Sequence, residues 1–140
     1  MKIKQLSLFL ENKPGHLLAI AKTLSDARIN ITTLSLADTE QFGIVRLIIR
    51  DWENAKATLE KAGFVTNLCD VIAVKVSHAP GGLAHLLALV SGVTNVEYMY
   101  AFPAQHQESA MLIFRFGDTD KAIAALKSAG CEPLKAEEIF

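Results

Sequence analysis

Apolar and polar side chains alternate along residues 3–11, so that Leu6, Leu8 and Leu10 share one face. This period of two predicts a half-buried β-strand. After residue 16 the period changes, because apolar residues recur three and four positions apart, which predicts an amphipathic helix. The elements expected after the first strand are a helix at 17–27, strands at 28–37 and 42–50, a helix at 52–62 and a strand at 64–69.

The same order of elements recurs in the second half. The pairs Pro14-Gly15 and Pro80-Gly81 are 66 positions apart, and the Ala-Gly pairs that end the second helix of each half are 67 apart. Such a repeat indicates two units of one type. The elements expected in the second half are a strand at 71–77, a helix at 82–91, strands at 94–102 and 109–116, a helix at 119–129 and a strand at 132–139.

Each half therefore has the order β-α-β-β-α-β, the ferredoxin-like arrangement in which both helices lie on one face of an antiparallel sheet. We predict an α+β protein with two tandem units of this type, at residues 1–70 and 71–140. No stretch of Gly, Ser or Pro separates the halves, so we expect the units to lie abutted side by side, as one extended sheet.

The Pro-Gly pair of each half, within residues 12–17 and 78–83, ends a strand and opens a helix. Such a turn leaves the first N–H groups of the helix free to bind an anion, so both segments are candidate binding sites. The alternative is that each Pro-Gly pair only forms a turn.

Charge and cysteine content narrow the classes of partner. The 140 residues carry 14 basic and 15 acidic side chains, a net charge of −1, which gives no electrostatic reason to bind nucleic acid or an anionic membrane. Cys69 and Cys131 lack CxxC spacing and are expected to be buried, reduced thiols. The N-terminus has no signal-peptide pattern, so we expect a cytoplasmic protein.

The distribution of reactive side chains argues against catalysis. The four histidines show no HxH, HxxxH or HExxH spacing, and neither Pro-Gly loop holds the thiolate pair of a metal carrier. No nucleophile or acid/base group has an evident supporting group. The central strand at 43–49 has no aromatic residue on which a nucleobase would stack. We expect no catalytic residue, no metal site and no cofactor.

The middle of the second half is unusually apolar. Glu97 and Glu108 are the only charged residues between positions 76 and 114, and the helix expected at 82–91 has no charged face. A helix without a polar face indicates a second buried side, against the other half or another subunit. The alternative is a poorly soluble surface.

Residues 12–17, followed by residues 24–31, resemble the signature of the ACT domain family: a polar residue, Pro-Gly, a helix of small and apolar residues, and Ile-Asn-Ile entering the second strand. Residues 79–83 and 93–96 resemble it more loosely. The resemblance implies a stand-alone tandem ACT protein, in which a small molecule, usually an amino acid, binds at an interface between paired ACT units.

The resemblance also implies ligand-binding residues. The expected residues are Asn12, Pro14, Gly15, His16, Leu17, Asn30 and Ile31 in the first half and Gly81, Gly82, Leu83 and Asn95 in the second. Gly15 and Gly81 lack a Cβ, so a ligand carboxylate can approach the N–H groups that follow them. Asn30 and Asn95 offer amide groups to the ligand, and His16 offers a lid or a hydrogen bond.

Each of these assignments has a plain alternative. Asn30 can serve only to cap a strand, and His16 can be merely a solvated first-turn residue. Gly82 stands where the first copy has His16, which predicts unequal sites or a single functional site. Four apolar positions would favour a hydrophobic or aromatic ligand, although core packing explains them equally well; they are Leu17, Leu83, Ile31 and Val96.

Two functions remain open. The first is a non-catalytic regulatory or sensor protein, a homodimer, that binds an amino acid between ACT units. The second is a structural or interaction module, whose exposed sheet edge and apolar second half dock on a metabolic enzyme without a ligand.

Overall fold

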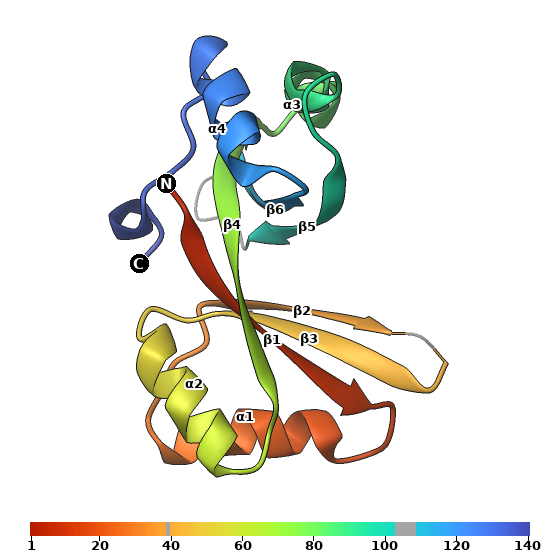
Figure 1. Cartoon of the computed structure of the whole chain (residues 1–140), viewed down its shortest axis with the longest axis vertical. Helices are drawn as coiled ribbons and strands as arrows, with labels where there is room; N and C mark the ends of the chain where they lie inside the picture. The colour runs from red at the N-terminus through yellow and green to blue at the C-terminus, as the bar shows by residue number, and fades with distance from the viewer. Residues whose placement is uncertain (39, 103–108) are drawn as a thin grey trace. The chain divides into compact units, whose positions relative to one another are not determined.

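The computed structural model describes residues 1–38, 40–102 and 109–140, which form two compact units. The N-terminal unit is Lys4–Cys69, and the C-terminal unit is Asp70–Phe140 together with Met1–Ile3 (Figure 1). The predicted domain boundary after residue 70 stays a prediction. The elements in chain order are β1 (Ile3–Glu11), α1 (His16–Asp26), β2 (Thr33–Asp38), β3 (Phe42–Ile48), α2 (Trp52–Lys61), β4 (Thr66–Ser77), α3 (Gly82–Val90), β5 (Val96–Phe102), β6 (Ser109–Phe116), α4 (Thr119–Ser128) and the 3₁₀ turn η1 (Ala136–Glu138).

The N-terminal unit has the strand order β2-β3-β1-β4, with β3 antiparallel to both β1 and β2. Both of its helices lie on one face of this sheet (Figure 1). The register places Leu8 opposite Val45 on that face, where they join Ile20 and Leu24 of α1 and Leu59 of α2 in the buried core. The alternation in residues 3–11 therefore defines the face that receives the helices, as predicted.

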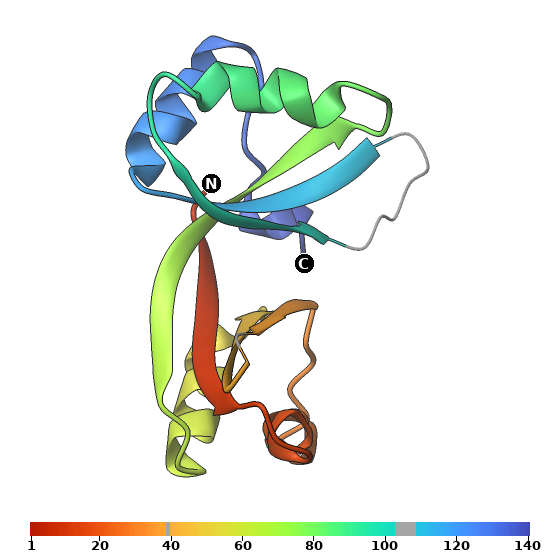
Figure 2. The same ribbon diagram turned by 90° about the vertical axis from the view of Figure 1, so that its right-hand side faces the viewer.

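The C-terminal unit has the strand order β4-β6-β5, and the 3₁₀ turn η1 stands where the repeat would place a further strand. Helices α3 and α4 lie on one face of the sheet (Figure 2). The core between sheet and helices includes Phe114, Leu86 of α3 and Leu126 of α4. The predicted fold class, two tandem ferredoxin-like units, is confirmed.

The prediction of a strand at residues 132–139 is wrong. Pro133 has no N–H to donate to a ladder, and Leu134 N–H makes a single bond to the Ala73 carbonyl, at 2.8 Å. The chain then turns, because the Lys135 N–H donates to the Glu138 carboxylate at 2.7 Å, and η1 follows. Local hydrogen bonds thus replace the sheet pairing that the repeat of elements suggested.

Two further boundaries differ from the prediction. The strands predicted at 64–69 and 71–77 are one continuous strand, β4, which has β1 and β6 as its neighbours in the sheet. Strand β2 begins at Thr33 and not at residue 28, because residues 28 and 29 complete the end of α1.

Helix α1 ends with a left-handed residue that is not glycine. Arg28 has φ 57°. Its N–H donates to the Ser25 carbonyl and the next N–H, of Ile29, donates to the Leu24 carbonyl, both at 2.9 Å, which is the Schellman pattern. Helices α2 and α4 end with the same pair of bonds, but there the left-handed residues are Gly63 and Gly130. The arginine therefore occupies a position that favours glycine.

We expect the Arg28→Gly variant to be more stable than the wild type by about 0.5–1 kcal/mol, because glycine adopts positive φ without a Cβ clash. Urea denaturation followed by circular dichroism measures the difference. The Arg28→Ala variant, which loses the same side chain but keeps a Cβ, serves as the control. A glycine variant no more stable than the alanine variant would contradict the prediction.

Candidate functional site

Helices α1 and α3 begin in the same unusual way. Their N-cap residues, Gly15 and Gly81, have φ 90° and 89°, and neither helix has a side-chain cap or an acidic residue in its first turn. Within the described residues, the N–H groups of Leu17 and Leu18 have no acceptor, and the same holds for those of Leu83 and Ala84. Each Pro-Gly turn therefore presents free N–H groups at the positive end of a helix.

The other two helices are capped. The Asp51 carboxylate accepts from the Asn54 N–H at 3.4 Å, and the Asp118 carboxylate accepts from the Lys121 N–H at 3.0 Å. Each also has an acidic residue in its first turn. The second helix of each unit thus carries its own carboxylate at the N-terminus, whereas the first helix leaves this position open to an external one.

The cap of α4 predicts a pH dependence. The Lys121 N–H bond, aided by the Lys121 charge, lowers the pKa of Asp118 below its ordinary value. Since the folded-state pKa is the lower one, the stabilisation is present above the unfolded-state pKa and is lost as the pH falls through the folded-state pKa. We expect the difference in Tm between wild type and Asp118→Ala, measured by calorimetry, to be largest near neutral pH and to shrink below about pH 4.

The matched control for this measurement is Glu132→Ala, which removes an exposed carboxylate of the same unit that caps no helix. Its Tm difference from wild type should be small at every pH. An Asp118→Ala difference that stays the same at pH 3 and pH 7 would show that the cap is not electrostatic.

The first Pro-Gly loop is open to solvent. Asn12, Pro14, Gly15 and Leu17 are exposed, and His16 is half-buried. The loop is held by the Asn12 N–H, which donates to the Gln41 carbonyl at 3.0 Å. Lys13 forms an ion pair with Glu11 and lowers the pKa of the Glu11 carboxyl by a direct hydrogen bond. The lysine charge is therefore offset within the loop, and the backbone N–H groups remain its principal attraction for an anion.

The glycines of the two loops differ in their surroundings. A Cβ built on Gly15 or Gly81 meets no atom within 4 Å, so the positive φ is the reason for glycine there. A Cβ on Gly82 would lie 2.2 Å from the Ser77 carbonyl oxygen. The difference between Gly82 and His16 therefore has a packing reason that is independent of any ligand.

The two asparagines lie at the other end of their helices. Asn30 lines a cavity of about 400 Å³, together with Ala21, Ser25, Arg28, Ile29 and Ile31. Asn95 lines a cavity of about 590 Å³ beyond the end of α3. Helix α1 has 11 residues and is therefore about 16 Å long. The structure does not bring Asn30 to the Pro-Gly loop of its own unit.

The four apolar positions of the candidate site separate into two kinds. Ile31 and Val96 pack against the cores of their units. Leu17 and Leu83 are 38% and 40% exposed at the helix N-termini. Core packing therefore accounts for two of the four, and they give no reason to expect a hydrophobic ligand.

Arg28 lines the cavity beside Asn30, and it was not among the residues that the sequence predicted for the site. The signal was present, because an arginine stands where the second helix of each unit ends in glycine. Leu18 was also missed. It is 68% exposed, and its N–H is one of the free donors of α1.

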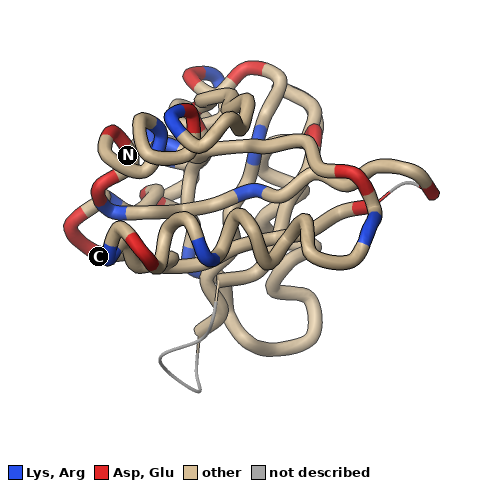
Figure 3. Tube along the Cα trace, turned by 90° about the horizontal axis from the view of Figure 1, so that it is seen from below, with Lys and Arg blue, Asp and Glu red and all other residues tan. Residues whose placement is uncertain are grey.

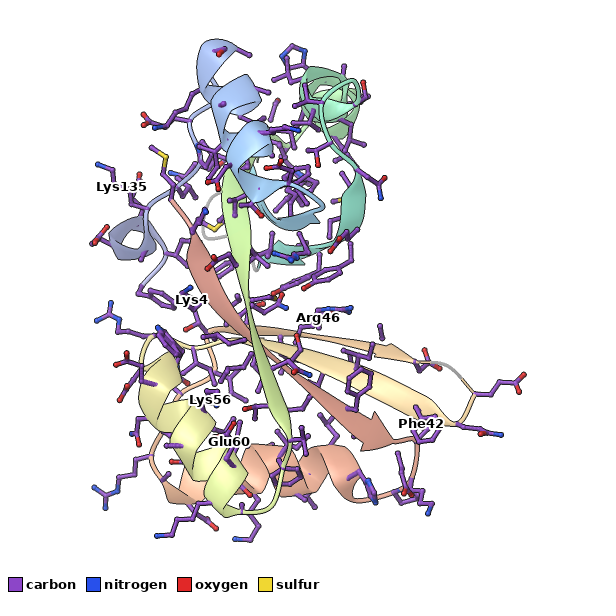
Figure 4. All side chains as sticks on the ribbon, viewed as in Figure 1. Lys4, Phe42, Arg46, Lys56, Glu60 and Lys135 are labelled. Carbon is purple, nitrogen blue, oxygen red and sulfur yellow. The ribbon has the colours of Figure 1, made fainter. Side chains whose placement is uncertain are left out.

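Several apolar side chains are exposed on the N-terminal unit. Leu34 and Leu36 of β2 are 45% and 47% exposed, and β2 is the edge strand of its sheet. Phe42, 53% exposed, projects from the start of β3 (Figure 4). An edge strand with exposed apolar side chains is suited to pairing with another chain.

In residues 1–38, 40–102 and 109–140, no group of three His, Cys, Asp or Glu side chains is placed to hold a metal ion. None of the helices in these ranges is long and apolar enough to cross a membrane. Acidic and basic positions are mixed along the described trace (Figure 3). His106 lies outside the described residues.

The two cysteines are half-buried, and Cys69 Sγ accepts a hydrogen bond from Gln5 Nε2 at 3.3 Å. Burial raises the pKa of the Cys131 thiol, which keeps it in the neutral form at neutral pH. Both cysteines were expected to be buried, and the structure leaves each of them partly exposed; their reduced state stays a prediction.

Comparison with known proteins places this geometry in a family. A family model of the ACT domain pair matches residues 1–131. Protein BT0572 from Bacteroides thetaiotaomicron is 35% identical, with a TM-score of 0.92, over 100% of this chain and 96% of that chain. Comparison with curated proteins gives no match.

Two further solved structures share the fold. The regulatory subunit of aspartate kinase from Thermus thermophilus, in its ligand-free form, is 16% identical with a TM-score of 0.65, over 91% of this chain and 90% of that chain. The corresponding subunit from Thermus flavus is 17% identical with a TM-score of 0.61, over 91% and 92%. The match to the family model and the relative that spans the whole chain agree with the repeated Pro-Gly turns, and the chain therefore belongs to the ACT domain pair family.

Proposed function

We propose that this protein is a non-catalytic regulatory protein that binds an amino acid at the N-termini of α1 and α3. The observation that carries the proposal is the contrast among the four helices. Those that follow the Pro-Gly turns begin at a left-handed glycine without a carboxylate, whereas α2 and α4 are capped by Asp51 and Asp118. A ligand carboxylate supplies the missing anion.

The ligand is held between ACT units of two copies of the chain. Its carboxylate accepts hydrogen bonds from the N–H groups of Leu17 and Leu18, beside Asn12 and His16. The amide of Asn30 is too far from this loop in its own unit, because α1 separates them by about 16 Å. A second copy therefore contributes Asn30, and ligand binding stabilises the homodimer.

The neighbouring fold supports a regulatory role. The similar chains from the two Thermus species are regulatory subunits of aspartate kinase. We propose by analogy that this protein regulates a metabolic enzyme, with no choice of enzyme implied. The exposed edge strand β2, with Leu34 and Leu36, is where we place the contact with a second copy.

A thermal-shift screen against the twenty amino acids and several aromatic acids tests the proposal. At a ligand concentration of about 100 times Kd, binding adds about 2.7 kcal/mol to the free energy of unfolding, which raises Tm by several degrees. Size-exclusion chromatography of the same samples reports dimer formation. We expect one class of amino acid to raise Tm and to favour the dimer.

A pair of variants assigns the site. Gly15→Trp places a bulky side chain where a Cβ has no neighbour within 4 Å, so the indole reaches into the space of the ligand. Gly63→Trp is the matched control, because Gly63 has a similar φ, 94°, and equally open surroundings at the end of α2. The ligand response should disappear in Gly15→Trp and persist in Gly63→Trp. A wild-type protein that no amino acid stabilises at millimolar concentration would overturn the proposal.

A second function is favoured by the exposed apolar side chains of β2 and β3. In this alternative the protein is an interaction module that docks on a metabolic enzyme, and the Pro-Gly segments are turns only. Partner binding would then persist in Gly15→Trp and be lost when Leu34 and Leu36 are replaced by serine.

A further inference from the structure

Arg28 occupies a backbone position that favours glycine. It takes φ 57° at the end of α1, where glycine fits without strain and where α2 and α4 have glycine. A left-handed arginine costs about 1 kcal/mol relative to glycine. Strain of this kind is retained where the side chain has another role.

The guanidinium lacks an internal counter-charge. Among the described residues, no carboxylate lies within ion-pair distance of Arg28. The acidic residue nearest to it in sequence, Asp26, is bound by Lys22, whose Nζ lies 2.9 Å and 3.2 Å from the two carboxylate oxygens. The charge of Arg28 is therefore available to an external anion.

The cavity that Arg28 lines has the chemistry of a small polar ligand site. Arg28, Ser25 and Asn30 are the polar residues that line this open pocket of about 400 Å³, and Ile29 and Ile31 are among its apolar residues. The guanidinium binds a carboxylate through two parallel hydrogen bonds, which the shorter polar groups beside it can supplement. Arg28 and Asn30 would thus contact the same ligand.

The equivalent cavity of the C-terminal unit has no charge. It lies beyond the end of α3 and is lined by Leu87, Val90, Ser91, Gly92, Val93, Thr94, Asn95 and Val96. The amide of Asn95 is kept, but no cation accompanies it. Any preference for a charged ligand that depends on Arg28 therefore belongs to the N-terminal unit alone.

We propose that Arg28 makes the N-terminal site selective for an amino acid with a second carboxylate, aspartate or glutamate, by pairing with its side-chain carboxylate. This rests on the proposed function, in which the α-carboxylate binds the N-terminus of α1 in one copy and Asn30 comes from a second copy. The α-carboxylate is then already bound, and the guanidinium beside Asn30 meets the side chain of the ligand.

Isothermal titration of the full chain with glutamate and glutamine, and with aspartate and asparagine, tests this selectivity. Each pair has nearly the same shape and differs in one negative charge. We expect the wild type to bind the acid of one pair at least about tenfold more tightly than its amide. Arg28→Gly, which suits the backbone at this position, should reduce that ratio to about twofold or less while retaining the amide affinity.

Lys61→Ala is the matched control, because it removes an exposed positive charge from the same unit at a residue that does not line the cavity. Its preference for the acid should equal that of the wild type. Equal affinity of the wild type for acid and amide, or an unchanged ratio in Arg28→Gly, overturns the role of Arg28 while the observed binding keeps the proposed function. A wild type that binds no amino acid overturns both.

Discussion

Replacement of Gly82 by alanine is expected to lower the free energy of unfolding by about 3 kcal/mol or more. The added Cβ would lie 2.2 Å from the Ser77 carbonyl oxygen and 3.2 Å from the carbonyl carbon. Both are backbone atoms at the end of β4, so relief requires the strand end or the start of α3 to move. Urea denaturation monitored by circular dichroism measures the loss, at an unchanged m-value if the denatured state is unaffected.

Alanine variants at two other glycines serve as controls, because they add the same methyl group without this clash. Gly92→Ala adds a Cβ that meets nothing within 4 Å, and a change within about 0.5 kcal/mol is expected. Gly81→Ala also meets nothing but stands at φ 89°, so a loss of about 1 kcal/mol is expected. If Gly82→Ala were no worse than Gly81→Ala, the close approach of Ser77 would not be what requires glycine.

Local patterns were sufficient to predict most of the architecture. The alternation around Leu6 and Leu8 and the turn chemistry of Pro14-Gly15 act over a few residues, and β1 and α1 form where they indicate. The second Pro-Gly pair likewise predicted the start of α3. These elements were predictable because their side-chain period and their turns are decided within the segment itself.

Elements that depend on distant partners were not predictable in this way. The repeat order predicts a strand at 132–139, but Pro133 limits the pairing, and the Leu134 N–H donates to the Ala73 carbonyl of β4. The continuity of β4 through residue 70 depends equally on having neighbours along its length. A strand forms only where a neighbouring strand can pair with it, and the local sequence pattern does not identify that neighbour.

The candidate site was predicted in part. The two Pro-Gly turns indicated the exposed helix N-termini. The helix expected at 17–27 already separated Asn30 from the Pro-Gly turn of its own unit, and the length of α1 agrees with that separation. The role of Gly82 depends on a carbonyl five residues away that only the folded chain brings close. Arg28 could be recognised only by comparing the ends of the helices. That comparison shows that its backbone has the positive φ that Gly63 and Gly130 have at the ends of α2 and α4.

Replacement of Phe114 by alanine is expected to lower the free energy of unfolding by about 3–5 kcal/mol, because it leaves a cavity in the core of the C-terminal unit. Phe114 lies on the central strand β6, opposite Ile72 of β4 and Met99 of β5, and is 0% exposed. Its ring stacks on that of Phe116, with centroids 5.4 Å apart. The deletion therefore removes contacts with both neighbouring strands and an aromatic pair worth about 0.5–1.5 kcal/mol beyond its buried area.

Phe9→Ala is the matched deletion, because it removes the same ring from a strand position that is 63% exposed. A loss below about 1 kcal/mol is expected there, since little apolar area leaves water when Phe9 folds. Equal losses in the two variants would mean that the core of the C-terminal unit relaxes around the missing ring. A rigid core cannot close a cavity of that size. The core around Phe114 would then be less tightly packed than the complete burial of this side chain indicates.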